Sequence, residues 1–281
     1  MVKYTISDAL KKGIALLNEN SIENPTLDAR ILLSEVMECD SLYLTMHRDD
    51  ELSDSCRDMF FSFIHRRAKN EPVGYIIEKK EFMSMEFFVD SNVLIPRPDT
   101  EILVEKAIDV LKGISNPTVI DMCTGSGAIA VSLAKYVEGS KVTGLDISEP
   151  ALMVAKKNAE SNGVDVEFKI HDVLSAYNGH KADAVVSNPP YISTEDMKKL
   201  ESNVADFEPH LALDGGADGL VFYRAIVNNI SSCLKKGGFL AFEVGMGQAE
   251  DVKKLMEPLF DNICIECDLA GIERVVSGFL K

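Results

Sequence analysis

From Thr118 onward, apolar runs of strand length alternate with segments of helical periodicity. Helix-length segments separate the runs at residues 118–122, 141–146, 166–170, 182–187 and 238–244. Two further runs, 262–268 and 272–280, leave no room for a helix between them. Alternating strands and helices form a mostly parallel sheet covered on both faces, and the two final strands should pair antiparallel at its end. The sequence therefore predicts an α/β fold with a seven-stranded, mostly parallel sheet.

The region before residue 76 shows helical periodicity without strand alternation. Its first two helices meet at Asn24-Pro25, and Ser53 should cap a third helix that ends at Arg66-Arg67. The expected apolar faces are Ile6, Leu10, Ile14 and Leu17; then Leu27, Ile31, Leu32, Leu33 and Val36; and finally Met59, Phe60, Phe63 and Ile64. Such stripes are more often core than interface, although the stretch from Phe60 to Ile64 could also dock a protein. We expect a small helical bundle that forms a substrate-docking domain over residues 1–75.

A short hairpin and a proline-rich break should separate this bundle from the sheet. Phe82, Phe87, Phe88 and Val89 flank Ser84, which suggests a hairpin that links two domains, with the linker at residues 76–95. The segment 96–101, Pro-Arg-Pro-Asp-Thr-Glu, then breaks the chain, and its aspartate, Asp99, can cap a helix that runs to about residue 111. The second predicted domain, which contains the sheet, covers residues 96–281.

Length and apolar content describe an ordinary globular protein. The chain has 281 residues, of which 46% are hydrophobic, enough for two domains that each bury a core. No apolar stretch has the length of a membrane span, and the first eight residues lack the apolar segment of a signal peptide. We therefore expect a cytoplasmic protein without a membrane partner. We expect a monomer.

The cysteines do not form a metal-binding pattern. Cys264 and Cys267 lie three apart in a predicted strand, where their side chains point to opposite faces, and no second pair accompanies them. The other four are scattered in apolar contexts, and we expect small buried side chains at Cys39, Cys56, Cys123 and Cys233. We expect no bound metal.

The charge balance restricts the partners of this protein. The chain has 29 basic and 45 acidic residues, a net charge of -16, and no basic cluster longer than a dipeptide. Affinity for nucleic acids comes mostly from Lys and Arg side chains that neutralise phosphates. We therefore expect no direct nucleic-acid partner. A negative field instead favours a small cationic ligand.

The segment Asp121-Met122-Cys123-Thr124-Gly125-Ser126-Gly127-Ala128-Ile129-Ala130 follows the first strand of the sheet and opens a helix. Its glycines permit a tight turn and a close approach of a ligand to the backbone. Asp146 ends the next strand, where a carboxylate can accept hydrogen bonds from ribose hydroxyls. These residues would suit the NAD cofactor of an oxidoreductase, and they would equally suit an adenosyl cofactor that carries a sulfonium. The chain has no clear hydride-transfer partner and is acidic, which favours the sulfonium.

Asn188-Pro189-Pro190-Tyr191 directly follows the apolar run Ala184–Ser187. The prolines stiffen the backbone and cannot donate an N–H. The Asn188 side-chain oxygen and the Pro189 carbonyl are therefore acceptors for a planar NH₂ group, and Tyr191 can pack against the molecule that carries it. A rigid strand-to-helix turn would use similar residues. We interpret the tetrapeptide as a clamp for an amide or amine nitrogen.

Together with further segments, these motifs resemble the PrmC/HemK family of protein-glutamine methyltransferases along nearly the whole chain. The segments, in order, are 96–101, 121–130, Asp146, 188–191, Phe207-Glu208-Pro209, 213–220 and Phe242-Glu243-Val244-Gly245. The resemblance implies a Rossmann-like class I fold and methyl transfer from S-adenosylmethionine. The implied acceptor is the side-chain amide nitrogen of glutamine in the Gly-Gly-Gln motif of class-one peptide chain release factors.

The resemblance also implies roles for individual residues. Asn188, Pro189 and Tyr191 would be catalytic, and together with Pro190 they would bind the substrate. The implied cofactor residues are Asp121, Cys123, Thr124, Gly125, Ser126, Gly127, Asp146 at the ribose, Asp172 and Val173 at the adenine, and Asn188. Cys123 stands where the family usually has glycine. It could narrow the pocket, but we expect instead that the turn needs no positive φ there.

Three alternatives remain open from the sequence. An adenine amino-methyltransferase of nucleic acid would share the Asn-Pro-Pro-Tyr segment, but the missing basic surface argues against it. A glutamine methyltransferase of a ribosomal protein is harder to separate, although the Pro-Arg-Pro-Asp-Thr-Glu segment resembles the release-factor branch. A non-catalytic binding module built on the helical domain is the third, and it need not bind the sulfonium.

Overall fold

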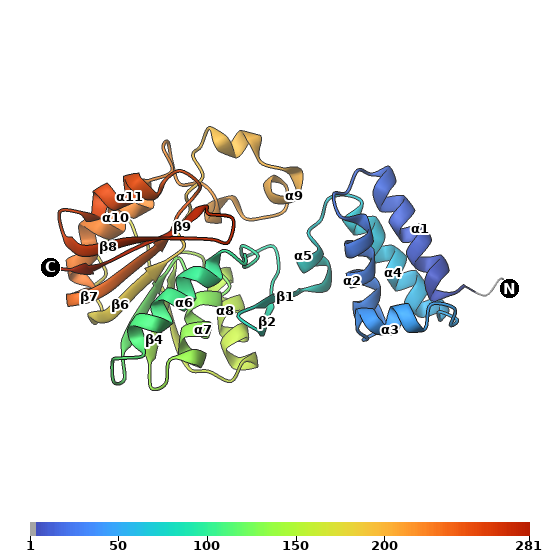
Figure 1. Cartoon of the computed structure of the whole chain (residues 1–281), viewed down its shortest axis with the longest axis horizontal. Coiled ribbons are helices and arrows are strands. Elements are labelled where there is room, and N and C mark those ends of the chain that lie inside the picture. Colours follow the sequence, from blue (N-terminus) through green and yellow to red (C-terminus); the bar gives the residue numbers. More distant parts are fainter. Residues whose placement is uncertain (1–3) are drawn as a thin grey trace. The chain divides into compact units, whose positions relative to one another are not determined.

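The computed structural model describes residues 4–281 (Figure 1). The first three residues lie outside the described residues, and so does that part of the expectation that the first eight residues form no signal peptide. The chain forms two compact units. One contains the residues up to Glu78 together with Glu201–Phe207, and the other contains Lys79–Leu200 and Glu208–Lys281. None of the helices in the described part is long and apolar enough to span a bilayer.

The first unit is a helical bundle, as predicted. Its helices are α1 (Ile6–Glu19), α2 (Pro25–Val36), α3 (Ser41–Met46), α4 (Asp54–Arg67) and α5 (Val73–Ile77), and Glu201–Phe207 adds the short α9 (Ser202–Ala205). The predicted cap of α4 is confirmed, since the Cys56 amide donates to the Ser53 hydroxyl at 3.2 Å. Sequence periodicity missed α3 and α5 because each has less than two turns.

The predicted apolar face of α2 is wrong in part. Leu32 and Leu33 are buried, but Leu27 and Ile31 are exposed. The helix instead buries Asp28, whose carboxylate accepts a hydrogen bond from Arg67 at 2.7 Å, and this ion pair turns the buried stripe away from the predicted one. On α4, Phe60 and Ile64 are fully buried and belong to the core, while Met59 is exposed.

The second unit contains the predicted seven-stranded sheet. Its strands are β3 (Thr118–Met122), β4 (Lys141–Asp146), β5 (Val166–Ile170), β6 (Ala182–Ser187), β7 (Leu234–Glu243), β8 (Phe260–Cys267) and β9 (Glu273–Leu280), in the order β5-β4-β3-β6-β7-β9-β8. β9 runs antiparallel to both of its neighbours, which confirms the predicted finish of the sheet. β7 begins earlier than predicted, since Leu234 pairs with Ala182 ahead of a register shift.

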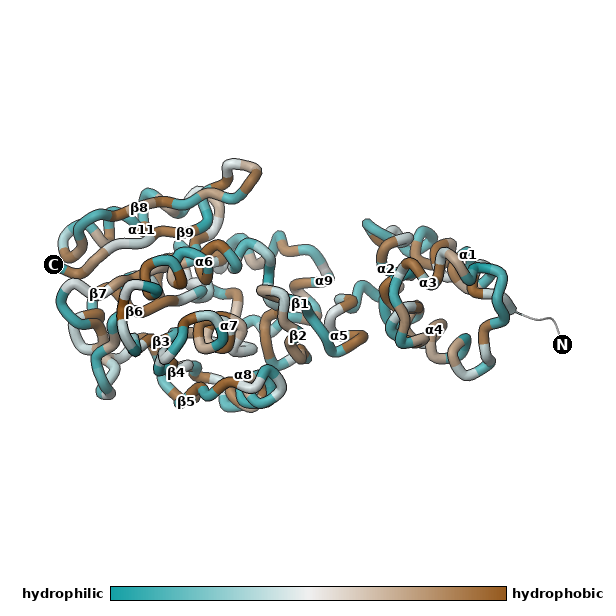
Figure 2. Tube along the Cα trace, turned by 60° about the horizontal axis from the view of Figure 1, so that its bottom comes forward, coloured by the Kyte–Doolittle hydropathy of each residue, from teal (hydrophilic) through white to brown (hydrophobic). Residues whose placement is uncertain are grey.

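Helices cover both faces of the sheet (Figure 1). One core joins alternate strand residues to α6 (Thr100–Leu111), α7 (Ala128–Tyr136) and α8 (Glu149–Ser161), and the other joins the intervening strand residues to α10 (Val221–Asn229) and α11 (Ala249–Met256). Val119 and Ile120, for example, belong to different cores, as the two-residue period of a strand requires. Figure 2 shows hydrophobic stretches along the strands and these helices.

The predicted hairpin is present as β1 (Lys79–Phe82) and β2 (Met85–Phe88), paired antiparallel. Phe82, Met85 and Phe87 pack into the same core as α6 and α7. The buried Asn158 of α8 anchors β2, because its amide accepts from the Phe88 N–H at 2.7 Å and donates to the carbonyl of Ser126 at 2.9 Å. The hairpin is therefore attached to the turn that follows β3.

Two further expectations were wrong. Asp99 precedes α6 but makes no capping hydrogen bond, because its own backbone is already helical, and its carboxylate pairs with Arg274 at 2.9 Å. Cys233 is buried, whereas Cys39, Cys56 and Cys123 are only partly buried. Isolated cysteines carry no periodic signal that would reveal how deeply they lie.

Candidate functional site

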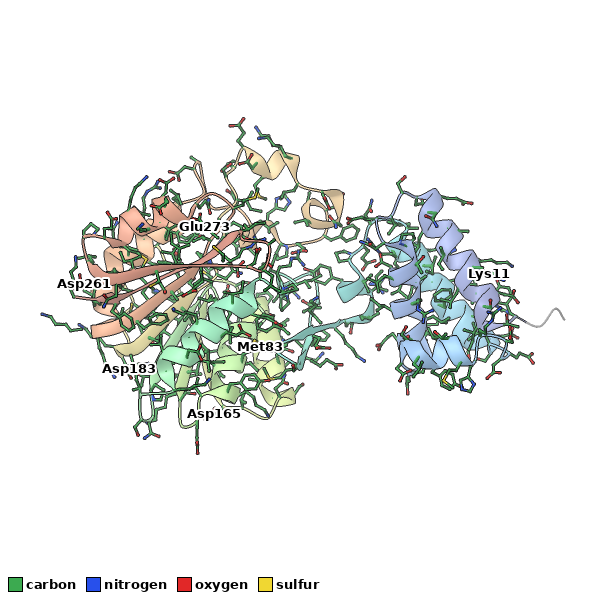
Figure 3. All side chains as sticks on the ribbon, viewed as in Figure 1. Lys11, Met83, Asp165, Asp183, Asp261 and Glu273 are labelled. Atoms are coloured by element: carbon green, nitrogen blue, oxygen red, sulfur yellow. The ribbon has the colours of Figure 1, made fainter. Side chains whose placement is uncertain are left out.

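The sheet reverses its strand order between β3 and β6. β4 and β5 lie on one side of β3, and β6 and β7 lie on the other. Met122 pairs with Ser187 at the carboxyl ends of these strands, so Cys123 and Asn188 leave the sheet side by side. Ligands of open α/β sheets bind at such a switch point. Asp165 and Asp183, labelled in Figure 3, mark the other, amino end of the sheet.

A pocket of about 250 Å³ opens at this switch point. The turn after β3 forms its floor and is tied to the sheet, because the Thr124 N–H donates to the carbonyl of Leu145 at 2.9 Å. Gly125 has a φ of +52°, and a Cβ there would have nothing within 4 Å, so the backbone is open to a ligand. The turn therefore has the close-approach geometry that the sequence predicts.

Cys123 adopts a positive φ of +60°, so the expectation that this turn needs none was wrong. Glycine is favoured in the left-handed region because a Cβ crowds the backbone there, which accounts for the glycine usual at this position in the resembled family. The Cys123 side chain lines the pocket. Burial raises the pKa of its thiol, which stays protonated at neutral pH and is no nucleophile.

This strain predicts a difference in stability between two small replacements. The left-handed conformation costs a residue with a Cβ about 1–2 kcal/mol, and the greater chain entropy of unfolded glycine offsets part of that. We expect Cys123→Gly to have a free energy of unfolding about 1 kcal/mol above that of Cys123→Ala. Urea titration of both variants measures it. Equal stabilities would mean that the turn relaxes without cost.

Two carboxylates support the turn in different ways. Asp121 is fully buried, and its Oδ2 accepts from the Thr124 hydroxyl at 2.5 Å and from the Ala130 N–H at 3.2 Å. Burial raises the pKa of Asp121 to about 7. Asp146 is partly exposed and accepts from the Gly125 N–H at 2.8 Å and the Ser148 N–H at 2.9 Å. Asp121 therefore holds the turn together, while Asp146 faces the pocket and keeps lone pairs for a ligand.

Apolar side chains form the wall beside Asp146. Ile147, Val173 and Leu174 line the pocket, and two of them are half-exposed, Ile147 at 50% and Leu174 at 52%. A flat apolar group would cover these side chains while its neighbouring hydroxyls reach the Asp146 carboxylate. An adenosyl group has both features. The residues present therefore fit the cofactor that the sequence suggests.

The Asn188–Tyr191 loop closes another side of the pocket. Asn188 and Pro190 line it, and the Asn188 amide donates to the Thr100 hydroxyl at 3.3 Å. The segment after residue 213 supports this loop from behind, since a Cβ on Gly219 would lie 2.3 Å from the Tyr191 carbonyl oxygen. That carbonyl also accepts from the Gln248 amide at 2.9 Å. The loop is held from two sides, which keeps Asn188 in place.

The structure brings most of the predicted site residues into one pocket. The residues that line it are Cys123, Thr124, Gly125, Ser126, Asp146, Asp172, Val173, Asn188 and Pro190. Asp121, Gly127, Pro189 and Tyr191 are outside that lining. Tyr191 packs against the core that contains α10 and α11, and burial raises the pKa of its hydroxyl.

Further residues line the pocket that were not assigned to the site from the sequence, although some of them lie in the motif segments 96–101, 121–130 and 207–209. They are Asn92, Val93, Leu94, Pro96, Arg97, Thr100, Ala128, Ile129, Ile147, Ser148, Ala151, His171, Leu174, Pro209, Leu211, Ala212 and Phe222. Those next to Asp146 and Asp172 could have been inferred from the strand ends. Ala128 and Ile129 directly follow the glycine turn. Most of the others come from distant segments, as Arg97 does, whose guanidinium pairs with the buried Glu208.

Comparison with known proteins identifies the family of this chain. The model of the PrmC N-terminal domain matches residues 8–77, and that of the methyltransferase small domain matches residues 98–217. The release factor glutamine methyltransferase of Clostridium acetobutylicum is 42% identical, over 96% of this chain and 97% of that protein. The chain belongs to the release factor glutamine methyltransferase family. The relative from Geobacter sulfurreducens, with the same name, is 38% identical over 98% of this chain and 96% of its own.

A solved structure agrees with the fold of this release factor glutamine methyltransferase family member. The crystal structure of a methyltransferase from Pyrococcus furiosus aligns with a TM-score of 0.52 at 15% identity, over 71% of this chain and 91% of that one. At this identity the likeness concerns the fold alone. It confirms the predicted Rossmann-like methyltransferase architecture.

Proposed function

We propose that this protein transfers the methyl group of S-adenosylmethionine to the side-chain amide nitrogen of glutamine in the Gly-Gly-Gln motif of class-one peptide chain release factors, which supports translation termination. Relatives that match nearly the full chain carry the name release factor glutamine methyltransferase. The observation that carries the proposal is the position of Asn188, in the same pocket as Asp146 and the glycine turn.

The proposed cofactor site uses the floor and the apolar wall of the pocket. Asp146 would accept hydrogen bonds from the ribose hydroxyls, Val173 and Asp172 would bind the adenine, and the turn from Cys123 to Gly127 would lie under the methionine end. Asp121 would act indirectly by holding that turn. When bound, S-adenosylmethionine supplies an electrophilic methyl carbon on a positively charged sulfur.

The proposed role of Asn188 is to hold and polarise the substrate amide. An amide nitrogen is a weak nucleophile because its lone pair is delocalised into the carbonyl. The Asn188 oxygen, with the Pro189 carbonyl as a second acceptor, would take up the two N–H groups and hold the nitrogen in line for attack. The same oxygens stabilise the positive charge that develops on the nitrogen. Tyr191 would stiffen the loop from the core side.

The two domains and the linker have separate proposed roles. We propose that the helical domain, residues 1–75, docks the release factor, that residues 96–281 form the catalytic domain, and that residues 76–95 link them. The separate family model for the N-terminal segment supports a distinct role for it. We further propose a cytoplasmic monomer.

Incubation with radiolabelled S-adenosylmethionine and a purified release factor tests the proposed function. We expect label on the glutamine of the Gly-Gly-Gln motif, located by mass spectrometry of its peptides. Parallel reactions with ribosomal proteins and with DNA or RNA test the two alternative methyltransferases. Label on nucleic acid or on a ribosomal protein, with none on the release factor, would overturn the proposal.

A further inference from the structure

Two buried side chains outside the Asn188–Tyr191 loop converge on Asn188. Thr100 is the first residue of α6, and Glu243 is the last residue of β7. β6 and β7 pair at Ser187 and Phe242, so Asn188 and Glu243 follow at neighbouring positions. Thr100 is 5% exposed and Glu243 is 3% exposed. The sequence motifs that contain these two residues thus meet at the proposed substrate clamp.

Their hydrogen bonds have a definite direction. The Asn188 Nδ2 donates to the Thr100 Oγ1 at 3.3 Å. Burial raises the pKa of the Glu243 carboxyl, and the Thr100 hydroxyl and the Asn188 amide offset part of that rise as hydrogen-bonding partners of the carboxylate. When Glu243 is ionised, its carboxylate can only accept, so the Thr100 O–H is directed to Glu243 and the Thr100 lone pairs remain for Asn188. Both N–H groups of Asn188 therefore have acceptors, and its oxygen is left for a ligand.

Structural needs alone do not account for the Glu243 carboxylate. Burial raises its pKa to about 7, above the usual range. Its Oε2 has no hydrogen-bond partner among residues 4–281. The nearby Tyr223 hydroxyl donates to the backbone carbonyl of Glu243 rather than to the carboxylate. A buried carboxylate with an unpaired oxygen is costly to stability, which suggests that it serves the site.

We propose that Glu243 and Thr100 are positioning residues that lock the Asn188 carboxamide with its oxygen toward the substrate. The proposal rests on the proposed function of the pocket. Without the lock, the amide can turn over and present its N–H groups where an acceptor is needed. A locked acceptor favours a glutamine amide and repels a glutamate carboxylate, so the two residues set the preference for glutamine.

The variant Thr100→Val tests the lock with little change in side-chain volume. We expect its kcat to fall about tenfold, because one neutral hydrogen bond is lost. We also expect the preference for glutamine to fall by a similar factor. That preference is the ratio of two dissociation constants, for a release factor with Gln→Glu in its Gly-Gly-Gln motif and for the unaltered one. Thr100→Ser restores the preference, because the hydroxyl returns.

The matched control is Thr143→Val, a change of the same type at a buried position of β4 outside the pocket lining. We expect it to keep the preference of the unaltered enzyme. Glu243→Leu should lower the preference for glutamine as Thr100→Val does. If Glu243→Leu does not fold, Thr100→Val alone decides the test. An unaltered preference in Thr100→Val would overturn the lock while leaving the proposed function intact.

A second measurement needs neither substrate nor turnover. Hydrogen exchange of the Asn188 side-chain amide can be followed by NMR, with its signal assigned through its loss in Asn188→Asp. We expect exchange about tenfold faster in Thr100→Val than in the unaltered protein, because the N–H groups lose an acceptor. Equal exchange rates would overturn the lock. If no release factor is methylated, the proposed function fails, and this measurement still decides the orientation of Asn188.

Discussion

Replacing Asn188 with alanine should lower kcat by about 10²- to 10³-fold, the usual loss when one preorganised group that stabilises transition-state charge is removed. In the proposed mechanism the Asn188 oxygen is the acceptor that holds the substrate nitrogen, and its effect would be greatest when charge develops on that nitrogen. Cofactor affinity should change far less, because Asp146 and the turn after β3 remain. Steady-state kinetics and calorimetry of cofactor binding measure the two effects separately.

A matched control for this variant is Asn229→Ala, in the same unit as Asn188, at the end of α10 and outside the pocket lining. It should keep both kcat and cofactor affinity. The informative comparison is the ratio of the two losses in Asn188→Ala. Comparable losses of kcat and of cofactor affinity would show that Asn188 mainly binds the cofactor, and the clamp would have to be abandoned.

The second large effect is expected from Asp146→Ala, which should weaken cofactor binding by about 10²-fold. A hydrogen bond to a charged group contributes about 1.5–3 kcal/mol, and in the proposed cofactor site Asp146 would offer its free lone pairs to the ribose hydroxyls. The carboxylate also accepts from the N–H groups of Gly125 and Ser148, so its loss loosens the turn as well. Calorimetry gives the affinity, and kcat at saturating cofactor should change much less.

Glu149→Ala is the control for this second variant, because Glu149 is an exposed carboxylate nearby that does not line the pocket. Its cofactor affinity should match that of the unaltered protein. Asp146→Asn keeps one acceptor oxygen and should fall between the two. Asp146→Ala with unaltered affinity would show that the cofactor ribose lies elsewhere.

Much of the fold could be predicted from local patterns. The strands from β3 to β9 lie close to the predicted runs. In the central strands β3 and β6, burial on both faces produces continuous apolar stretches that a sequence displays directly. The early start of β7 was missed because Lys235-Lys236-Gly237-Gly238 is typical of a turn, although Leu234 is buried and paired. The stripe of α2 was misplaced because its buried ion pair joins two helices, which periodicity cannot show.

At the site, too, some features could be predicted from local sequence and others depend on tertiary packing. The glycine turn, Asp146 and Asn188 are recognisable from sequence because each directly follows a strand whose end is visible in the chain. The positive φ of Cys123 could not be recognised from the sequence, because a backbone angle follows from how β3, β4 and the turn pack together. The acceptor chemistry of Asn188 is local, but its orientation depends on Thr100 and Glu243, which only the tertiary fold brings beside it.

The sequence by itself therefore determined the class of fold, the strand ends and the chemical types of the groups that follow them, because these depend on periodicity and side-chain chemistry within a few residues. Only the tertiary structure decided which distant segments complete the pocket, which carboxylates are buried, and which way the Asn188 amide faces. Those properties arise from packing between segments far apart in the chain, where no local pattern records the partner.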